Sequence, residues 1–483
     1  MSPRPPGRLS ASFRSQDAPL LRTTAERWFG LLTVACRPRQ SQSDDSKTEL
    51  GILPKRLRLR TLTLTAAATL GSTVLVSCGT SASQSAPPAK QGQRSEAAAC
   101  AWPVEDSYQT ANSGLPDTAA WEWGQSFTIR PGTQVVVSGA YPDARYASFT
   151  VYSSSQLPFT SNGVPSTLAD YQIAPDRDSA NPWRRVAAPG GHFTLKLRLQ
   201  VSPGQVNVLP LAPAGVTSGV GYIEYRVYLP AAGNALRIAL PHITIESPGS
   251  TQQLRACTSH TTAIPPPVRP TTTTTQAATP SASPSSRPAP LQFFRAAFQT
   301  YFPNPETAYL LAYTTPPTAS QVIVVTGKAP ASPASAHPSI WPSRTEQVRY
   351  WSMCVNLGEG TDPAVVNHLP DGKTDLGCRA DDATKVNADG TYTYVIGTEA
   401  QRATIDRVAG ATFLPLSLAQ PAAPLYLLAM RYTLANPSFE FAPQNITQTE
   451  SAPAAARTMG AYYPRAQICS LSALSAGGAS ACS

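Results

Sequence analysis

The 483-residue sequence lacks the short motifs that mark common enzyme classes. It has no His-Glu-x-x-His, no Gly-x-Ser-x-Gly turn, no phosphate-binding loop and no dinucleotide-binding glycine pattern. Its five histidines stand singly along the chain, so a histidine-rich metal centre would need residues from distant segments. We therefore predict no catalytic residue, no metal site and no cofactor.

Two aspartate-rich loops are the remaining candidates for chemistry. Aspartates in turns usually accept hydrogen bonds from nearby backbone N–H groups, and this is the favoured interpretation. The alternatives are a cation site or a pair of catalytic carboxylates beside a cleft. The six residues are Asp170, Asp176, Asp178, Asp381, Asp382 and Asp389.

The sequence also lacks a strong charge excess once its first 77 residues are set aside. The formal net charge of the whole chain is +9, from 38 Lys/Arg and 29 Asp/Glu. Residues 1–77 contain twelve of the basic and five of the acidic residues, which leaves 26 and 24. Nucleic acid is therefore not expected as a partner, because such proteins carry a basic surface.

No hydrophobic run reaches the roughly 20 apolar residues that span a bilayer. The longest candidate follows the basic segment 55–60 and ends at Leu75-Val76-Ser77-Cys78. A basic segment, an apolar segment and small residues before a cleavage point are the layout of an export signal. The last four residues resemble the bacterial lipobox. This resemblance implies cleavage before Cys78 and acylation of its thiol, whereas an uncleaved membrane anchor is the alternative.

The segments around this signal carry no pattern of a folded core. Residues 1–54 are expected to be either a disordered extension or the product of a start codon assigned too early. Residues 55–77 are the expected lipoprotein signal peptide, and residues 78–99 a flexible tether rich in small polar residues. The predicted location is the extracytoplasmic face of the cell membrane, where the acylated N-terminus contacts the lipid bilayer.

Six of the eight cysteines remain after Cys36 and Cys78 are set aside. An even number in an exported chain favours disulfides, although six cysteines allow fifteen pairings. Their distribution favours three local pairs, and the spacings fit no compact zinc site. The expected pairs are Cys100 with Cys257, Cys354 with Cys378, and Cys469 with Cys482.

Short runs rich in β-branched and aromatic residues, separated by Gly, Pro, Asn and Asp, predict β-strands. Helical periodicity is weak outside residues 291–302. The expected fold is all-β, with two tandem antiparallel β-sandwich domains of jelly-roll-like type. We place the first at 100–257 and the second at 291–483, joined by a Pro/Thr/Ser-rich linker at 258–290.

The two predicted domains share three short matches in the same order. Val136–Pro142 (VVSGAYP) matches Val324–Pro330 (VVTGKAP), and an Arg-Tyr-x-Ser pattern follows each. A late strand then carries an arginine in both copies. These matches indicate a duplication. The paired residues are Arg145 and Arg349, Tyr146 and Tyr350, and Arg226 and Arg431.

Strand alternation places Arg145 on the same face as Phe149 and Val151. An arginine there is expected at the mouth of the strand, paired with a carboxylate or with turn carbonyls. Exposed aromatic residues beside arginine would suit a glycan or lipid partner of the envelope, although most are expected in the core. The residues considered for such binding are Trp341, Tyr350, Trp351, Arg349, Arg145 and Tyr146.

The second half resembles an uncharacterised bacterial β-domain family. The resemblance rests on RYWSMCV at 349–355, NADGTYTYVIG at 387–397, ATFLPLS at 411–417 and the late strand that begins at Leu425. The family has an Asn-Trp-Leu-Pro opening where this chain has Ala411-Thr412-Phe413-Leu414-Pro415. The resemblance implies a jelly-roll-like sandwich and no particular activity. The Ala/Pro-rich composition and Thr-Pro tract also resemble exported actinobacterial lipoproteins.

These observations favour a secreted, membrane-anchored lipoprotein that acts as a binding or accessory module of the cell envelope. The alternative is a hydrolase or transferase acting on envelope carbohydrate or lipid. Two carboxylates within about 10 Å in a cleft would favour the enzyme. A flat aromatic patch would favour binding, and a plain structural spacer would show neither.

Overall fold

The computed structural model describes residues 100–482 except 235–236, 262–290, 299–301 and 448–450. The expected extension, signal, tether and most of the linker lie outside these residues, and so do Leu75, Val76, Ser77 and Cys78. All the described residues belong to one compact unit. Among the described residues, no helix has the length and apolar character needed to cross a bilayer.

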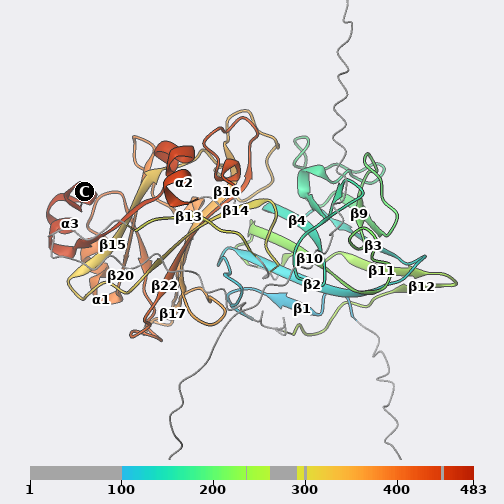
Figure 1. Cartoon of the computed structure of the whole chain (residues 1–483), viewed down its shortest axis with the longest axis horizontal. Coiled ribbons are helices and arrows are strands. Elements are labelled where there is room, and N and C mark those ends of the chain that lie inside the picture. The colour runs from blue at the N-terminus through green and yellow to red at the C-terminus, as the bar shows by residue number, and fades with distance from the viewer. Residues whose placement is uncertain (1–99, 235–236, 262–290, 299–301, 448–450, 483) are drawn as a thin grey trace, which may run out of the picture. The chain divides into compact units, whose positions relative to one another are not determined.

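Two sheets, whose strands pair mainly antiparallel, make up the first half of the described chain (Figure 1). Their orders are β1-β2-β10-β4-β7 and β12-β11-β3-β8-β9. The strands are β1 (Val104–Asp106), β2 (Ala120–Ile129), β3 (Gln134–Ala140), β4 (Ala144–Tyr152), β7 (Thr167–Ala169), β8 (His192–Arg198), β9 (Val208–Pro210), β10 (Gly219–Pro230), β11 (His242–Ser247) and β12 (Ser250–Gln253). A small hairpin joins β5 (Thr160–Ser161) and β6 (Val164–Pro165).

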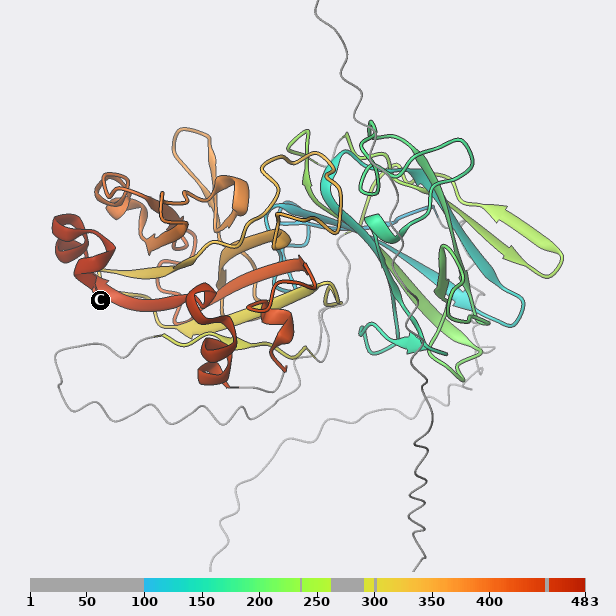
Figure 2. The same ribbon diagram turned by 90° about the horizontal axis from the view of Figure 1, so that it is seen from above.

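The second half, coloured from yellow to red in Figure 2, also contains two sheets. Their orders are β13-β14-β22-β16-β19 and β21-β20-β15-β23, so the second sheet has one strand fewer than its counterpart. The strands of this half are β13 (Phe294–Arg295), β14 (Thr307–Thr314), β15 (Gln321–Lys328), β16 (Val348–Leu357), β19 (Cys378–Ala380), β20 (Thr391–Gly397), β21 (Ala411–Pro415), β22 (Tyr426–Ala435) and β23 (Arg465–Ser470). Strands β17 (Val366–His368) and β18 (Thr374–Leu376) form a separate hairpin.

The strand orders agree with the duplication. The matched segments fall on β3 and β15, on β4 and β16, and on β10 and β22, which occupy the same places in their sheets. Both halves also contain one parallel pair in the second sheet, β8 with β9 and β20 with β21. The described chain is thus mostly β, with two sandwich-like halves, which confirms this part of the predicted fold.

Each half buries apolar side chains between its two sheets. Alternation on β4 directs Ala147, Phe149 and Val151 into the core of the first half, as the sequence predicted. In the second half Trp351 and Tyr394 are among the residues of the corresponding core. At about 1.5 to 3 kcal/mol for each large apolar side chain, this burial is the main stabilising contribution.

The structure contains the three disulfides that the sequence predicted. Cys100 is bonded to Cys257, Cys354 to Cys378, and Cys469 to Cys482. The first disulfide joins the residue that lies shortly before β1 to the segment that follows β12. The second links β16 to β19, whose residues pair directly. The third fixes the last turns of the chain.

Helices in the described part of the chain are few and short. They are α1 (Glu399–Ile405), α2 (Ala452–Met459) and α3 (Leu471–Gly477), with 3₁₀ turns η1 (Asp170–Gln172), η3 (Asp381–Ala383), η4 (Pro443–Asn445), η5 (Gly460–Tyr462) and η6 (Ala479–Cys482). Where helical periodicity was expected, at residues 291–302, the described residues contain no helix, and Phe294–Arg295 pairs with β14 as an edge strand.

Candidate functional site

The two copies of the Arg-Tyr motif meet where β4 and β16 begin. Arg145 Nη1 donates to the backbone oxygen of Arg349 at 3.5 Å, and Arg349 Nη1 donates to the backbone oxygen of Arg145 at 3.1 Å. Both side chains are fully buried. The motif therefore builds the boundary between the halves, and each copy contacts the other.

Each of these arginines is paired with an aspartate of the other half. Arg145 Nη1 lies 2.8 Å from Asp381 Oδ2, and Arg349 Nη1 lies 3.4 Å from Asp170 Oδ1. Burial raises the pKa of both carboxyl groups to about 6, although the arginines act in the opposite direction. The expected pairing of Arg145 with a carboxylate is present. Arg145 does not lie at an open end of the strand, as was expected, because residues of the other half cover it.

The aspartates are placed by matching turns. Asp170 begins η1 directly after β7, and Asp381 begins η3 directly after β19. Asp170 accepts a hydrogen bond from the Ala147 N–H at 2.8 Å, and Asp381 accepts one from the Asp382 N–H at 2.9 Å. These two aspartates thus combine the turn role that the sequence favoured with an ion pair across the boundary.

The two motif tyrosines are also buried at this boundary. Tyr350 donates to Asp117 Oδ2 at 2.7 Å, and Ser352 donates to the same oxygen at 2.5 Å. In the first half, the Tyr146 hydroxyl lies 3.3 Å from the side-chain oxygen of Asn304. Asn304 occupies the position in the second half that Asp117 occupies in the first. Burial raises the pKa of both tyrosines well above the usual value, so they act as neutral hydrogen-bond donors.

The residues considered for ligand binding are therefore not on an open surface. Arg145, Tyr146, Arg349 and Tyr350 are buried in the boundary. Trp341 is 4% exposed. The Arg349 guanidinium carbon lies over the Trp341 ring, 4.9 Å from the ring centre. Trp351 is 1% exposed and packs against Tyr392 and Tyr394 in the core of the second half. We assign these side chains to folding and to the contact between the halves.

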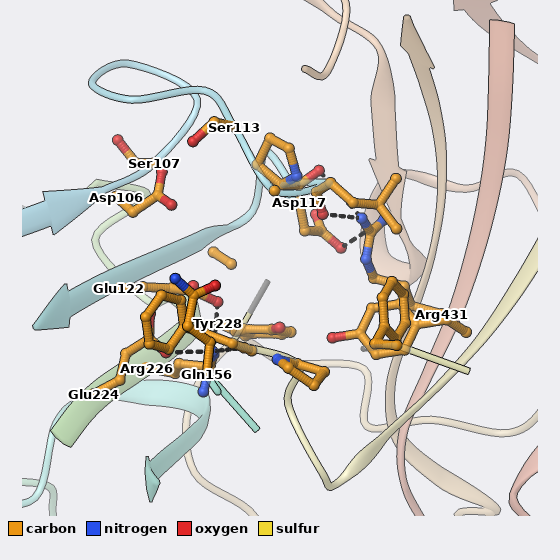
Figure 3. A pocket seen from close by; sticks show the side chains of 18 residues that line it. Asp106, Ser107, Ser113, Asp117, Glu122, Gln156, Glu224, Arg226, Tyr228 and Arg431 are labelled. Atoms are coloured by element: carbon orange, nitrogen blue, oxygen red, sulfur yellow. Dashed lines mark hydrogen bonds and ion pairs between the residues drawn. The ribbon is translucent and has the colours of Figure 1, made fainter. Parts of the chain in front are cut away.

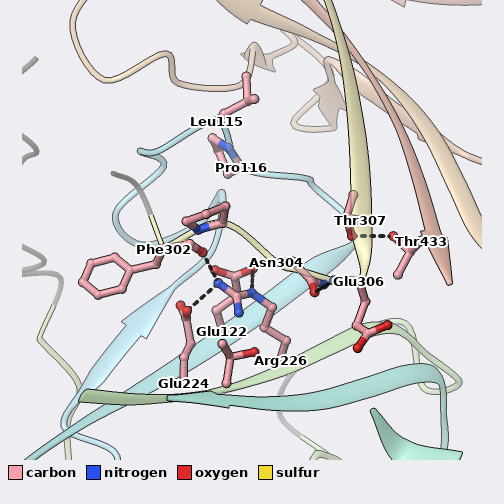
Figure 4. A network of polar contacts seen from close by, with 12 residues as sticks. Leu115, Pro116, Glu122, Glu224, Arg226, Phe302, Asn304, Glu306, Thr307 and Thr433 are labelled. Carbon is pink, nitrogen blue, oxygen red and sulfur yellow. Dashed lines mark hydrogen bonds and ion pairs between the residues drawn. The ribbon is translucent and has the colours of Figure 1, made fainter. Parts of the chain in front are cut away.

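The third matched pair, Arg226 and Arg431, crosses the boundary in the same reciprocal manner. Arg226 Nη2 donates to the backbone oxygen of Phe302 at 2.5 Å (Figure 4). Arg431 Nη2 donates to the backbone oxygen of Leu115 at 2.6 Å. Both acceptor residues precede the first long strand of the opposite half and have positive φ angles. Each arginine thus holds the segment that leads into the first long strand of the other half.

A cavity of about 50 Å³ lies beside these arginines (Figure 3). Its charged lining comes from both halves and comprises Asp106, Asp117, Glu122, Glu224, Arg226 and Arg431. Arg226 Nε lies 2.7 Å from Glu122 Oε1, and its Nη2 contacts Glu224. Arg431 lies 3.9 Å from Asp117. Four carboxyl groups thus face two guanidinium groups.

Strand register explains why acidic residues gather here. Asp106 on β1 pairs with Glu122 on β2, and Glu122 pairs with Arg226 on β10. Directly paired residues of antiparallel strands project from the same face of a sheet. Glu224 lies two residues before Arg226 and therefore projects from that face as well.

The electrostatic environment of this cavity favours neutral acids. Burial, together with a smaller effect of the nearby Glu122, raises the pKa of Asp106 to about 8, although Arg226 acts in the opposite direction. Burial also raises the pKa of Glu224 well above its usual range, although Arg226 opposes this. At both groups the effect of burial exceeds the opposing effect of the Arg226 guanidinium.

Sequence reasoning singled out Arg226 but missed the acidic residues around it. Glu122 lies between the buried Trp121 and Trp123 on β2, and Glu224 lies two residues before Arg226. A carboxylate within an aromatic-rich strand was the signal that could have identified these residues, because charged residues are rarely buried without a partner. Nothing local indicated Asp106, because its neighbourhood depends on pairing between β1 and β2.

A second hollow lies entirely within the first half. It is an open groove of about 790 Å³, formed by the loops at one end of the sandwich. Its polar lining includes Gln134, Asn162, Arg198, Gln200, Ser202, Gln205 and Thr217. Arg198 contacts the side-chain oxygen of Gln134, whose amide donates to Glu246 at 2.6 Å. The described lining contains no aromatic side chain.

One further group of potential metal ligands occurs among the described residues, formed by Asp117, Cys354 and Cys378. The two sulfurs are bonded to each other. Metal coordination by cysteine requires a free thiolate. This group therefore does not form a metal centre in the oxidised protein.

No protein-family model matches the sequence, and no curated protein matches it either. Among solved structures, the chain is similar to an uncharacterised protein from Burkholderia cenocepacia, with 14% identity and a TM-score of 0.43. That match covers 79% of this chain and 85% of the other. A second, the VPA0106 protein from Vibrio parahaemolyticus, has 12% identity and a TM-score of 0.36, covering 74% and 90%. Similarity at this level gives no indication of activity.

Proposed function

We propose that the protein is an exported, acyl-anchored lipoprotein that serves as a non-catalytic binding module of the bacterial cell envelope. The proposal includes the jelly-roll-like character of each half and the relationship to the uncharacterised β-domain family. The supporting observation is the set of three disulfides, which uses every cysteine of the described residues. Disulfides persist in oxidising compartments, and such a compartment is the destination of a chain carrying a lipobox.

The size of the charged cavity argues against the alternative of a hydrolase or transferase. Glu122 and Glu224 do converge, since both contact the Arg226 guanidinium. However, ligand pockets typically measure about 300 to 1,000 Å³, and this cavity measures about 50 Å³. It has room for water or an ion and not for a sugar ring or an acyl chain.

The groove of the first half is the better candidate for a binding surface. Its volume of about 790 Å³ lies within the range of small-molecule sites. Amide, hydroxyl and guanidinium groups hydrogen-bond to hydroxyl-rich ligands. We therefore favour a polar envelope glycan as the partner, since Gln134, Arg198 and Gln205 supply such groups. The apolar residues Leu199, Val201 and Val216 line the groove beside them.

Replacing Cys78 tests the anchor. Wild-type protein is expected in the membrane fraction, with an intact mass that corresponds to the chain from residue 78, three disulfides and covalent acyl groups. The Cys78→Ala variant should be neither cleaved at this position nor acylated. Wild-type protein that retained residues 1–77 and carried no acyl group would contradict the proposal.

Substitutions in the groove test the binding role. Arg198→Ala should weaken the retention of the folded protein on purified envelope polysaccharide by more than about tenfold, since a hydrogen bond to a charged group contributes roughly 1.5 to 3 kcal/mol. Gln134→Ala should weaken it by a smaller factor, since a neutral hydrogen bond contributes roughly 0.5 to 1.5 kcal/mol. Arg185→Ala removes an exposed arginine outside the groove and serves as the matched control. Equal retention of all three variants would exclude the groove. Release of sugars from the polysaccharide would support the enzyme instead.

A further inference from the structure

The cavity at the boundary of the halves carries more acidic groups than its folding role requires. Arg226 has Glu122 and Glu224 as direct partners, and Asp106 follows Glu122 across the sheet. On the opposite wall, Asp117 is already supplied with donors by Tyr350 and Ser352. The wall formed by β1, β2 and β10 therefore has three carboxyl groups and one guanidinium.

Asp106 lacks a partner for one of its buried oxygens. The residue is 9% exposed and lines the cavity. Within the described part of the chain, its Oδ1 atom has no hydrogen-bond donor. Leaving a buried acceptor unsatisfied costs about 1 to 3 kcal/mol, and more when the group is charged. An oxygen in this state is available to a ligand that carries positive charge.

The second half shows that this acidity is not needed to build the boundary. Tyr309 pairs with Arg431 as Glu122 pairs with Arg226. The matching position for Glu224 is Ala429, two residues before Arg431. The backbone N–H of Ala296 donates to the Tyr309 carbonyl, which places Ala296 where Asp106 lies in the first half. The same scaffold thus forms with no acid at these three positions.

The chemistry and the size of the cavity select the ligand. Its acidic groups offer carboxylate oxygens, which are the preferred donors for calcium and magnesium. A volume of about 50 Å³ accommodates an ion with a few waters. The described lining contains no histidine or cysteine, so softer metals have no suitable donor.

We propose that this cavity binds a divalent cation of the calcium type, coordinated by the carboxylates of Asp106 and Glu122 and completed by water. Water ligands are necessary because the acidic oxygens do not form a compact set of three among the described residues. Glu224 stays paired with Arg226, and cation binding favours the ionised form of Asp106, whose proton is released to solvent. The affinity expected for such a site is that of extracellular calcium modules, with a Kd of roughly 10⁻⁴ to 10⁻³ M.

Terbium luminescence provides a direct test, because terbium(III) substitutes for calcium and is excited by neighbouring tyrosines. Tyr228 and Tyr309 line the cavity and serve as the donors. The chain beginning at residue 78, with its disulfides intact, is titrated with terbium and then with calcium. Sensitised emission that calcium displaces is expected. Calcium should also raise the unfolding temperature, because a ligand that binds only the folded state stabilises it.

Two matched variants make the test specific. Asp106→Asn should weaken terbium and calcium binding at least tenfold, whereas Asp406→Asn, which removes an exposed carboxylate elsewhere, should leave binding unchanged. If Asp106→Asn does not fold, Glu122→Gln takes its place, with the same expected loss. The proposal is overturned by the absence of calcium displacement up to about 10 mM, well above the expected Kd. Unchanged binding in the folded variant would also overturn it. Neither result bears on the anchor or on the groove.

Discussion

Arg226 and Arg431 occupy matching positions in the two halves but differ in the charges around them. Arg226 is held between Glu122 and Glu224. Arg431 has Asp117 at 3.9 Å and the sulfur of Cys354 at 2.9 Å. Both donate to a backbone oxygen of the opposite half. The duplication has therefore retained the contact that crosses the boundary, while the compensating charges have diverged.

The largest expected effect comes from removing each arginine in turn. Arg226→Met leaves Glu224 buried without its cation, and breaking a buried pair in this way costs about 3 to 5 kcal/mol. Arg431→Met should cost only about 1 to 2 kcal/mol, since Asp117 keeps its donors Tyr350 and Ser352. Chemical denaturation of the mature chain measures both values. Equal losses would show that the acidic groups do not distinguish the two environments.

A medium effect is expected from pH, and it should be shared by the two halves. Asp170 and Asp381 have folded pKa values of about 6, above the ordinary value of 3.8. Folding therefore favours their neutral forms, and the associated stability is present below pH 4 and is lost as pH rises through 6. Between pH 5 and pH 7.5 each should lower the free energy of unfolding by on the order of 1 kcal/mol.

Substitution by asparagine isolates this contribution, because asparagine keeps an acceptor oxygen and does not titrate. The free energy of unfolding of Asp170→Asn and of Asp381→Asn should each vary less with pH than that of the wild type, by similar amounts. Denaturation curves at several pH values provide the comparison. If only one variant differed from the wild type in the pH dependence of its free energy of unfolding, the two ion pairs would not be equivalent.

The smallest effect tests Tyr309, the residue that replaces Glu122 in the second half. Its hydroxyl accepts a hydrogen bond from the backbone N–H of Asn304 at 3.3 Å. Tyr309→Phe leaves that buried donor without its acceptor and should cost about 1 kcal/mol. Thermal unfolding of this variant and of Tyr313→Phe, on the same strand but exposed, gives the measurement and its control. A loss of 3 kcal/mol or more would assign Tyr309 a larger role than this hydrogen bond.

Much of the fold was predictable because its signals are local. Alternation along β4 and the repeated Val-Val-x-Gly segments identified strands and the duplication, and the distribution of cysteines identified the disulfides. Alternation indicates which residues share a face, but it does not reveal that a second half covers the end of a strand. Arg145 and Tyr146 were consequently considered for ligand binding although they are buried.

The acidic cavity could not be predicted from its sequence neighbourhood. Asp106 and Glu122 are brought together by the pairing of β1 with β2, and Arg226 is about a hundred residues further along the chain. Register between strands so far apart is decided by the packing of whole sheets. The isolated carboxylate between two tryptophans on β2 was a sign of an unusual environment, but it did not identify the partners.

The reciprocal contacts of Arg145 and Arg349 also resemble those of a symmetric dimer. Each arginine finds its carboxylate and its carbonyl acceptor in the other copy of the repeat. In symmetric homodimers, one surface patch meets an identical patch in this way. The two repeats of this single polypeptide therefore contact each other as the two subunits of a symmetric dimer do, with each supplying the carboxylate and the carbonyl oxygen that the other's arginine needs.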